Sequence, residues 1–236
     1  PTQKNLQSKQ LHTILESYWD LRSRLYPLDA TMQGDHRFNH LLPNDQTASF
    51  RSDLAQFYAL QLNELEKVQR EILSENDKIS YDIFKYEMEI QLEGIKDEDW
   101  MMPITQFWGL HLTMPQLGTG DSFQPFATVK DYENWLGRIK GFSAWADSAI
   151  ENMKKGMAEN YVLPKSLVIK IIPQLKDIIV KDHTKSLFYQ PITKFPASFN
   201  ETEKKQLTEA YVQAIKTEIN PTYLKLLNFI EQEYLP

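Results

Sequence analysis

Residues 126–141 read FATVKDYENWLGRIKG, and the rest of the chain is organised around this segment. Thr128 stands three residues before Asp131, an arrangement that satisfies the free backbone N–H groups at the start of a helix. Apolar residues then recur at helical spacing, so one side of this helix must be buried; they are Tyr132, Trp135, Leu136 and Ile139. The other side is predicted to be polar and carries Lys130, Glu133, Asn134 and Arg138.

Two glycines in this stretch have predicted roles. Gly137 lies inside the helix, where it costs roughly 1 kcal/mol relative to Ala, so we expect a close neighbour to need the space. Gly141 is predicted to end the helix, because Gly is favoured just beyond a helix C-terminus. A further run of apolar residues at helical spacing follows at residues 145–157.

The same helical periodicity extends over the rest of the chain. No stretch alternates with the period of two that is typical of strands, and only 8 of the 236 residues are Gly, which disfavours tight β-hairpins. We therefore predict an all-α fold, with one helical domain over residues 1–236. It is expected to be an irregular array of about eight helices joined by long structured loops.

One of these helices is expected to be contacted from two sides. Ser74 and Asp77 predict its start, and the pattern continues to about Ile95. One face carries Ile79, Ile83, Tyr86 and Ile90, and another carries Phe84, Met88 and Leu92. So broad an apolar surface predicts a partner on each side.

Composition excludes several classes of function. The net charge is −6, which disfavours nucleic acid as a partner because phosphate binding needs clustered Lys and Arg. The chain has no Cys, so disulfides, thiolate metal sites and Cys nucleophiles are excluded. No segment approaches the roughly 18 apolar residues that a transmembrane helix needs.

No catalytic motif is visible. The five histidines form no His-Glu-x-x-His pattern, and His36 and His40 lie in a polar loop without an adjacent Glu, as ordinary loop histidines do. The chain also contains no Gly-x-Ser-x-Gly elbow, dinucleotide fingerprint or phosphate loop. We therefore predict no catalytic, cofactor-binding or metal-ligating residue in this chain. Trp100, Phe107 and Trp108 could line a pocket, but core packing is the preferred interpretation.

Several segments resemble one bacterial family. ATMQGDHRFN at residues 30–39, followed by LPND at residues 42–45, is similar to the A-T-x-x-G-D-x-R-[F/Y]-[D/N] opening of the family catalogued as domain of unknown function 885. ISYDI at 79–83, MPITQ at 102–106 and the helix at 126–138 resemble its later elements in the same order. SLFY at 186–189 resembles an S-P-x-Y/F element, with Leu187 in place of Pro.

The resemblance implies a function for the chain. Family members are usually longer, and their later part carries a His-Glu-x-x-Pro-Gly-His helix like that of a zinc metallopeptidase. This chain would then be the N-terminal half of a zinc-dependent peptidase or hydrolase, a fragment that forms a wall or lid of the substrate cleft. The zinc would lie in the missing C-terminal half, which would be its partner, and the substrate would be a peptide. Many relatives carry lipoprotein or secretory leaders, which implies a location in the cell envelope or periplasm rather than in the cytoplasm.

Six residues are candidates for facing the substrate: Asp35, His36, Arg37, Asn39, Gln106 and Trp108. Four of them lie in the polar segment 29–49, which is longer than most connections, and loops of that length are often functional. The alternative is that the cluster at 34–39 only braces this loop.

Two other functions stay open. One is a self-contained, non-catalytic helical binding or scaffold protein, and the other is a hydrolase that is active within these 236 residues. A fragment is expected to expose apolar surface on its last helix, at Tyr223, Leu227 and Tyr234, whereas a complete module would cover it.

Overall fold

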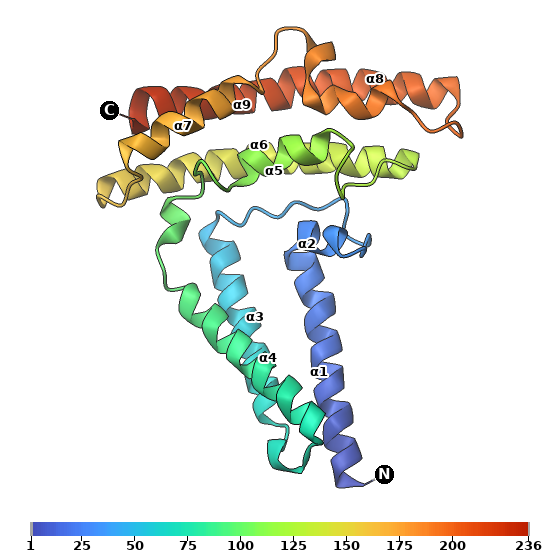
Figure 1. Ribbon diagram of the computed structural model, residues 1–236, viewed down its shortest axis with the longest axis vertical. Helices are drawn as coiled ribbons and strands as arrows, with labels where there is room; N and C mark the ends of the chain where they lie inside the picture. Colours follow the sequence, from blue (N-terminus) through green and yellow to red (C-terminus); the bar gives the residue numbers. More distant parts are fainter. Residues whose placement is uncertain (1, 236) are drawn as a thin grey trace. The chain divides into compact units, whose positions relative to one another are not determined.

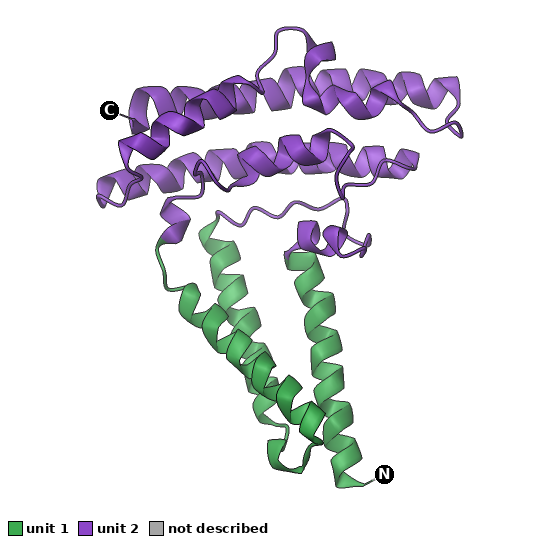
Figure 2. Ribbon diagram, in the orientation of Figure 1, with its two compact units in different colours: residues 1–25, 47–98 green, residues 26–46, 99–236 purple. Residues whose placement is uncertain are grey.

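The computed structural model describes residues 2–235 (Figure 1). This part of the chain holds nine α-helices and no strand, which confirms the all-α prediction. Contacts divide the chain into two compact units, one of residues 1–25 and 47–98 and the other of residues 26–46 and 99–236 (Figure 2). Each unit has its own apolar core. The prediction of one domain over the whole chain stays a prediction.

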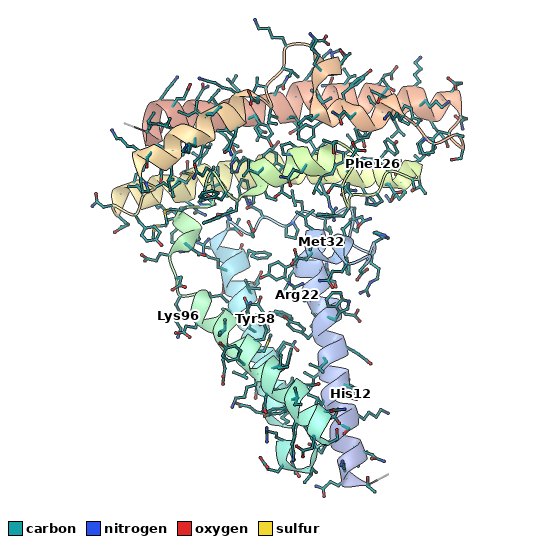
Figure 3. The ribbon with its side chains drawn as sticks, in the orientation of Figure 1. His12, Arg22, Met32, Tyr58, Lys96 and Phe126 are labelled. Atoms are coloured by element: carbon teal, nitrogen blue, oxygen red, sulfur yellow. The ribbon has the colours of Figure 1, made fainter. Side chains whose placement is uncertain are left out.

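Unit 1 consists of three long helices. They are α1 (Gln3–Leu25), α3 (Ala48–Glu66) and α4 (Glu75–Gly94), with a 3-10 turn at Arg70–Ile72 between the last two. The side chains of Thr47 and Ser74 accept hydrogen bonds from backbone N–H groups at the starts of α3 and α4, so the predicted helix start at Ser74 is confirmed. The core between the helices includes Leu11, Tyr58 (Figure 3), Leu65, Tyr81, Phe84 and Met88.

Unit 2 is built around α6 (Val129–Ala158), which is 30 residues long. The elements that accompany it are α2 (Pro27–Met32), α5 (Leu110–Gly118), α7 (Lys165–Lys176), α8 (Glu201–Ala214) and α9 (Asn220–Phe229). Short 3-10 helices lie at Asp99–Met101, His183–Lys185 and Leu187–Thr193, and π turns at Ile215–Ile219 and Ile230–Tyr234. In Figure 1, α7, α8 and α9 form a layer that lies along α5 and α6.

The start of α6 is as predicted, but its end is not. Thr128 and Asp131 form the expected capping box. The helix then continues through Gly141 to Ala158, so the prediction that Gly141 ends it is wrong. Residues 33–46 connect α2 to α3, and we name them the strap. Gly141 is needed because the strap passes close to α6 at this position, and it does not end the helix.

Two of the three glycines of α6, Gly137 and Gly141, face this strap. A Cβ atom on Gly137 would lie 3.1 Å from the carbonyl oxygen of His40, which confirms that a close neighbour needs the space. A Cβ atom on Gly141, one helical turn later, would lie 2.9 Å from the carbonyl oxygen of Leu42. Glycine at both positions therefore lets the strap backbone pass directly over the helix.

Substituting Gly141 with Ala tests this packing. We expect Gly141→Ala to lower the free energy of unfolding by about 1–3 kcal/mol, because the added methyl group displaces backbone rather than a mobile side chain. Urea unfolding followed by circular dichroism measures the change. Lys140→Ala, at an exposed position of the same helix, is the control and should change the value by less than about 0.5 kcal/mol. A Gly141→Ala variant as stable as this control would show that the strap does not press on α6.

Candidate functional site

Arg138 holds the strap and α2 against α6. The sequence predicted it on the polar side of the helix, and this is wrong, because the side chain is fully buried at 0% exposure. Its guanidinium donates from Nε to the Leu41 carbonyl at 3.1 Å, from Nη1 to Gln124 Oε1, and from Nη2 to the Pro27 carbonyl at 3.1 Å and Thr31 Oγ1 at 2.7 Å. Four neutral oxygens therefore accept hydrogen bonds from the buried fork, which has five N–H donors.

Burial has an electrostatic consequence for this arginine. Removal from water lowers the pKa of Arg138 to about 10, so the side chain stays protonated at neutral pH. All four acceptors are oxygens of uncharged groups, and their dipoles replace the lost hydration. Asn134, predicted on the same polar side, is also buried.

Asn39 belongs to the same buried network. Its Oδ1 lies 2.7 Å from Thr31 Oγ1, whose single proton can go there or to the Pro27 carbonyl. Its Nδ2 lies 3.3 Å from Nδ1 of the exposed His36. Asn39 therefore connects the turn at residues 34–39 to the Arg138 network, and this geometry favours the bracing role.

The charged candidates on this turn pair with each other. Arg37 donates from Nη2 to Asp35 Oδ2 at 2.7 Å and from Nε to Asp35 Oδ1 at 2.9 Å, and its guanidinium lies 5.3 Å from the ring centre of Phe38. Gly34 has a φ of +85°, a conformation that glycine adopts without strain. The turn thus presents Arg37 and His36 to solvent from a fixed backbone.

The other candidates lie in the aromatic loop, as we name residues 103–109. Thr105 closes this loop, because its Oγ1 accepts hydrogen bonds from the backbone N–H groups of Phe107 and Trp108, both at 3.1 Å. Its own N–H donates to the Trp108 carbonyl at 3.1 Å. Gly109 has a φ of +131°, and a Cβ atom there would lie 2.8 Å from the Pro103 carbonyl oxygen, so only Gly fits. The loop is therefore well braced.

This loop carries two large aromatic side chains into solvent. Phe107 is 71% exposed and Trp108 is 62% exposed, and the two rings stack with centres 6.5 Å apart. The expectation that they pack in the core is therefore wrong for both. Burying an aromatic side chain would contribute roughly 1.5–3 kcal/mol, so two adjacent exposed rings on a rigid loop indicate an interaction site.

Polar atoms without hydrogen-bond partners are buried around the base of the aromatic loop. They are Oε1 of Gln106, Oε1 of Gln174 and both ring nitrogens of His111. Gln174 contacts the loop directly, since its Nε2 donates to the Gln106 carbonyl at 3.0 Å. Buried polar atoms are almost always paired, so unpaired ones call for a partner such as a ligand or a water molecule.

His111 is held in its neutral form. Burial lowers its pKa to about 4, and the nearby backbone of Thr105 offsets only part of this effect. The imidazole at neutral pH therefore presents one N–H donor and one lone pair. Sequence reasoning missed both His111 and Gln174, because neither belongs to a recognisable motif; the only local signal is Gly109 two residues before His111.

The two groups of candidates lie at different places along α6. The turn at 34–39 is attached at Arg138, whereas Met101, just before the aromatic loop, packs against Gly156, where a Cβ would lie 3.2 Å from the Met101 carbonyl oxygen. Eighteen residues of helix separate these points, or about 27 Å. Figure 1 likewise places α2 and the Asp99–Met101 turn apart. The structure does not bring the six candidates into one cleft.

Unit 2 also contains a small pocket of roughly 250 Å³, away from all six candidates. Its lining residues are Thr119, Gly120, Asp121, Phe126, Tyr132, Gln190, Pro191, Thr193 and Lys194. Over residues 2–235, no three His, Cys, Asp or Glu side chains are grouped so as to hold a metal ion. None of the described helices combines the length and apolar character needed to cross a membrane.

Comparisons with known proteins identify relatives. A family model described as "Bacterial protein of unknown function (DUF885)" matches residues 27–236. The crystal structure of "the putative lipoprotein from Colwellia psychrerythraea" has a TM-score of 0.73 at 16% identity, which shows a shared fold. The match covers 96% of this chain but only 41% of that one. No curated protein matches the chain significantly.

Proposed function

Because the chain belongs to the bacterial DUF885 family of unknown function, we propose that it forms the non-metal wall of the substrate cleft in a longer zinc-dependent hydrolase. The substrate in this proposal is a peptide. The chain spans well under half of the solved relative, which leaves room in such a protein for a second part that carries the catalytic centre. The motif expected for that centre, His-Glu-x-x-Pro-Gly-His, has no counterpart in these 236 residues.

The aromatic loop is the main structural support for the proposed function. Phe107 and Trp108 offer flat apolar surface, and Gln106 and Gln174 each have an unpaired side-chain oxygen nearby. A peptide in extended conformation presents apolar side chains and backbone N–H donors, which match these two features. Pockets for small molecules and peptides typically combine mostly apolar lining with a few fixed polar groups.

The cell envelope is the proposed location. The solved relative is described as a "putative lipoprotein", and a lipoprotein anchor would hold the protein at a membrane without a transmembrane helix. This part of the proposal rests on the relative alone. Cell fractionation with an antibody against the chain tests it, and recovery in the cytoplasmic fraction would contradict it.

Alanine substitutions in the aromatic loop test the proposed role in substrate binding. In the product of the complete gene, we expect Phe107→Ala combined with Trp108→Ala to lower kcat/KM for peptide hydrolysis about 10- to 100-fold, since aromatic anchors typically contribute more than 2 kcal/mol. The zinc content should not change. Leu224→Ala, at a half-exposed position of α9, is the matched control. A double variant with the kcat/KM of this control would contradict the proposed function.

One observation favours the alternative, a self-contained binding or scaffold protein. Tyr223, Leu227 and Tyr234 were expected to be exposed in a fragment, and this expectation is wrong, because all three are buried. They pack in the core of unit 2 with residues of α6 and α7. Under this alternative, the complete gene product would bind peptides without hydrolysing them.

A further inference from the structure

Helix α4 carries an exposed apolar stripe on the side away from its core. The stripe consists of Ile79, Ile83, Tyr86 and Ile90, which are 58%, 64%, 63% and 42% exposed. Their spacing of four, three and four residues keeps them on one face of the helix. The opposite face, with Tyr81, Phe84 and Met88, packs in the core of unit 1. Both α1 and α3 contact α4, but of the two apolar faces that the sequence predicted to be covered, the stripe stays exposed.

Solvent exposure of this stripe is unusual for a surface helix. A helix that packs on one core normally has one apolar face and an opposite face of polar residues. Here the second face has three isoleucines and a tyrosine in a continuous row over three turns. A contiguous patch of this kind marks a protein–protein contact.

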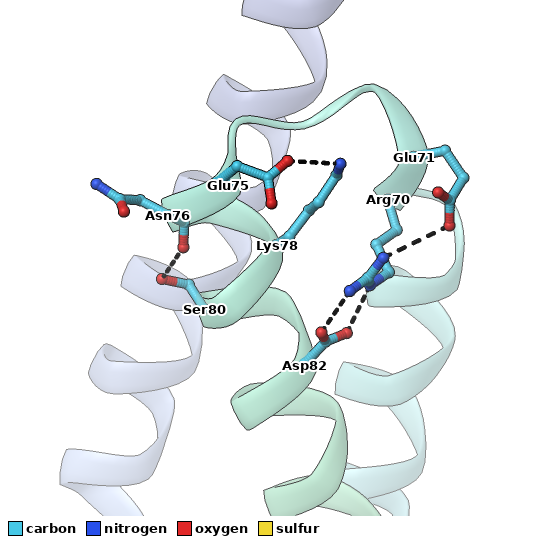
Figure 4. A network of polar contacts seen from close by, with 7 residues as sticks. All are labelled: Arg70, Glu71, Glu75, Asn76, Lys78, Ser80 and Asp82. Carbon is cyan, nitrogen blue, oxygen red and sulfur yellow. Dashed lines mark hydrogen bonds and ion pairs between the residues drawn. The ribbon is translucent and has the colours of Figure 1, made fainter.

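Acidic side chains border the stripe. At 100° per residue, the neighbouring helical positions are occupied by Glu75, Asp82, Glu87, Glu89 and Glu93. Lys78 and Lys85 lie farther round the helix. Arg70 pairs with Asp82 through two hydrogen bonds of 2.6 Å, and Lys78 pairs with Glu75 at 2.9 Å (Figure 4). Lys85 also pairs with Glu89 at 3.8 Å. With these three pairs formed, Glu87 and Glu93 leave the border with an excess of two negative charges.

We propose that the stripe of α4 docks a helix that follows residue 236 in the same polypeptide, with apolar residues facing α4 and basic residues flanking them. This rests on the proposed function, in which the chain is part of a longer protein. The solved relative supports an occupant from the same polypeptide, because 59% of that chain lies outside the match. The family resemblance implies that this further part follows residue 236. A helix laid on the stripe would cover the second apolar face of α4, as its sequence pattern predicts.

Charge argues against two other occupants. In a second copy of the chain, the stripe would bring the same acidic border, and like charges across an interface cost affinity. An anionic lipid surface would be repelled by the same carboxylates. A basic helix is instead attracted to this border.

Photocrosslinking identifies the occupant. We would place p-benzoylphenylalanine at Ile83 in the complete gene product, expressed in its own host, and map crosslinked peptides by mass spectrometry. The same group at Leu6 of α1, a half-exposed residue outside the stripe, is the control. We expect an intramolecular crosslink from position 83 to a helix beyond residue 236, at least fivefold above the control.

Every other outcome overturns the inference: a crosslink within residues 1–236, to a second copy, to lipid or to another protein, or none above the control. Circular dichroism of the labelled protein establishes that it is folded. The outcome is also separable from that of the proposed function. A zinc-containing, active product without the crosslink refutes only the α4 contact, whereas the crosslink in a product without zinc or hydrolysis refutes only the proposed function.

A second measurement uses the 236-residue chain alone. Without its partner, the stripe should bind a hydrophobic dye such as anilinonaphthalene sulfonate. We expect Ile83→Ser combined with Tyr86→Ser to lower dye fluorescence at least twofold while thermal stability is kept, since both residues are exposed. Equal dye binding by the variant and the original chain would count against an accessible stripe.

Discussion

The Arg138→Met variant is expected to lose about 3–5 kcal/mol of unfolding free energy, the largest effect of any single substitution considered. Methionine fills similar space but donates no hydrogen bond. The Leu41 carbonyl and Gln124 Oε1 would then lose the donor that Arg138 supplies, whereas the Pro27 carbonyl can still accept from Thr31 Oγ1. Each unsatisfied buried acceptor costs roughly 1–3 kcal/mol. Water that enters near these acceptors can replace part of the lost hydrogen bonding, which lowers the total loss of stability.

Urea unfolding monitored by circular dichroism measures this loss. Arg138→Lys keeps the charge but cannot form the planar fork, so we expect an intermediate loss. Arg37→Met is the matched control, because Arg37 is half-exposed and pairs with Asp35 on the surface turn; it should change stability by less than about 1 kcal/mol. If Arg138→Met were as stable as Arg37→Met, Arg138 would not hold the strap.

The second large effect is a loss of stability at mildly acidic pH through His111. Its pKa is lowered to about 4 by burial, against about 6.5 in the unfolded chain. Between these values the unfolded state binds more protons than the folded state, so stability falls as the pH drops from 6.5 towards 4. The contribution from His111 amounts to about 2 kcal/mol between pH 7 and pH 5.

A comparison of variants isolates this contribution. We expect His111→Leu to remove about 2 kcal/mol of the difference between the unfolding free energies measured at pH 7 and pH 5. His40→Gln, at an exposed position of the strap, should leave the difference unchanged. The same pH dependence in His111→Leu as in the original chain would mean that His111 titrates normally.

The sequence predicted those features of the fold that depend on local spacing. The capping box at Thr128, the start of α4 at Ser74 and the buried stripe of α6 all follow from residues three or four apart. The end of α6 did not, because Gly141 serves a contact with Leu42, about a hundred residues away in sequence. Local rules cannot distinguish a glycine that ends a helix from one that admits a neighbouring backbone.

The candidate site was harder to predict, because it too depends on contacts between residues that are distant in the sequence. Arg138 is polar and was placed on the solvent side, but its partners are carbonyls of the strap and α2, which carry no sequence signal. Phe107 and Trp108 were expected in the core, since exposed aromatic residues are the exception. Gln106 was identified only through the family resemblance, and the unpaired atoms of Gln174 and His111 depend on how distant segments meet.

The zinc content of two purified proteins tests the central claim most directly. The complete gene product and the 236-residue chain would be analysed side by side by inductively coupled plasma mass spectrometry after dialysis. We expect about one zinc per polypeptide in the complete product, as in catalytic zinc sites, and none retained by the 236-residue chain. Stoichiometric zinc in the 236-residue chain, or a complete product that holds no zinc, would contradict the central claim.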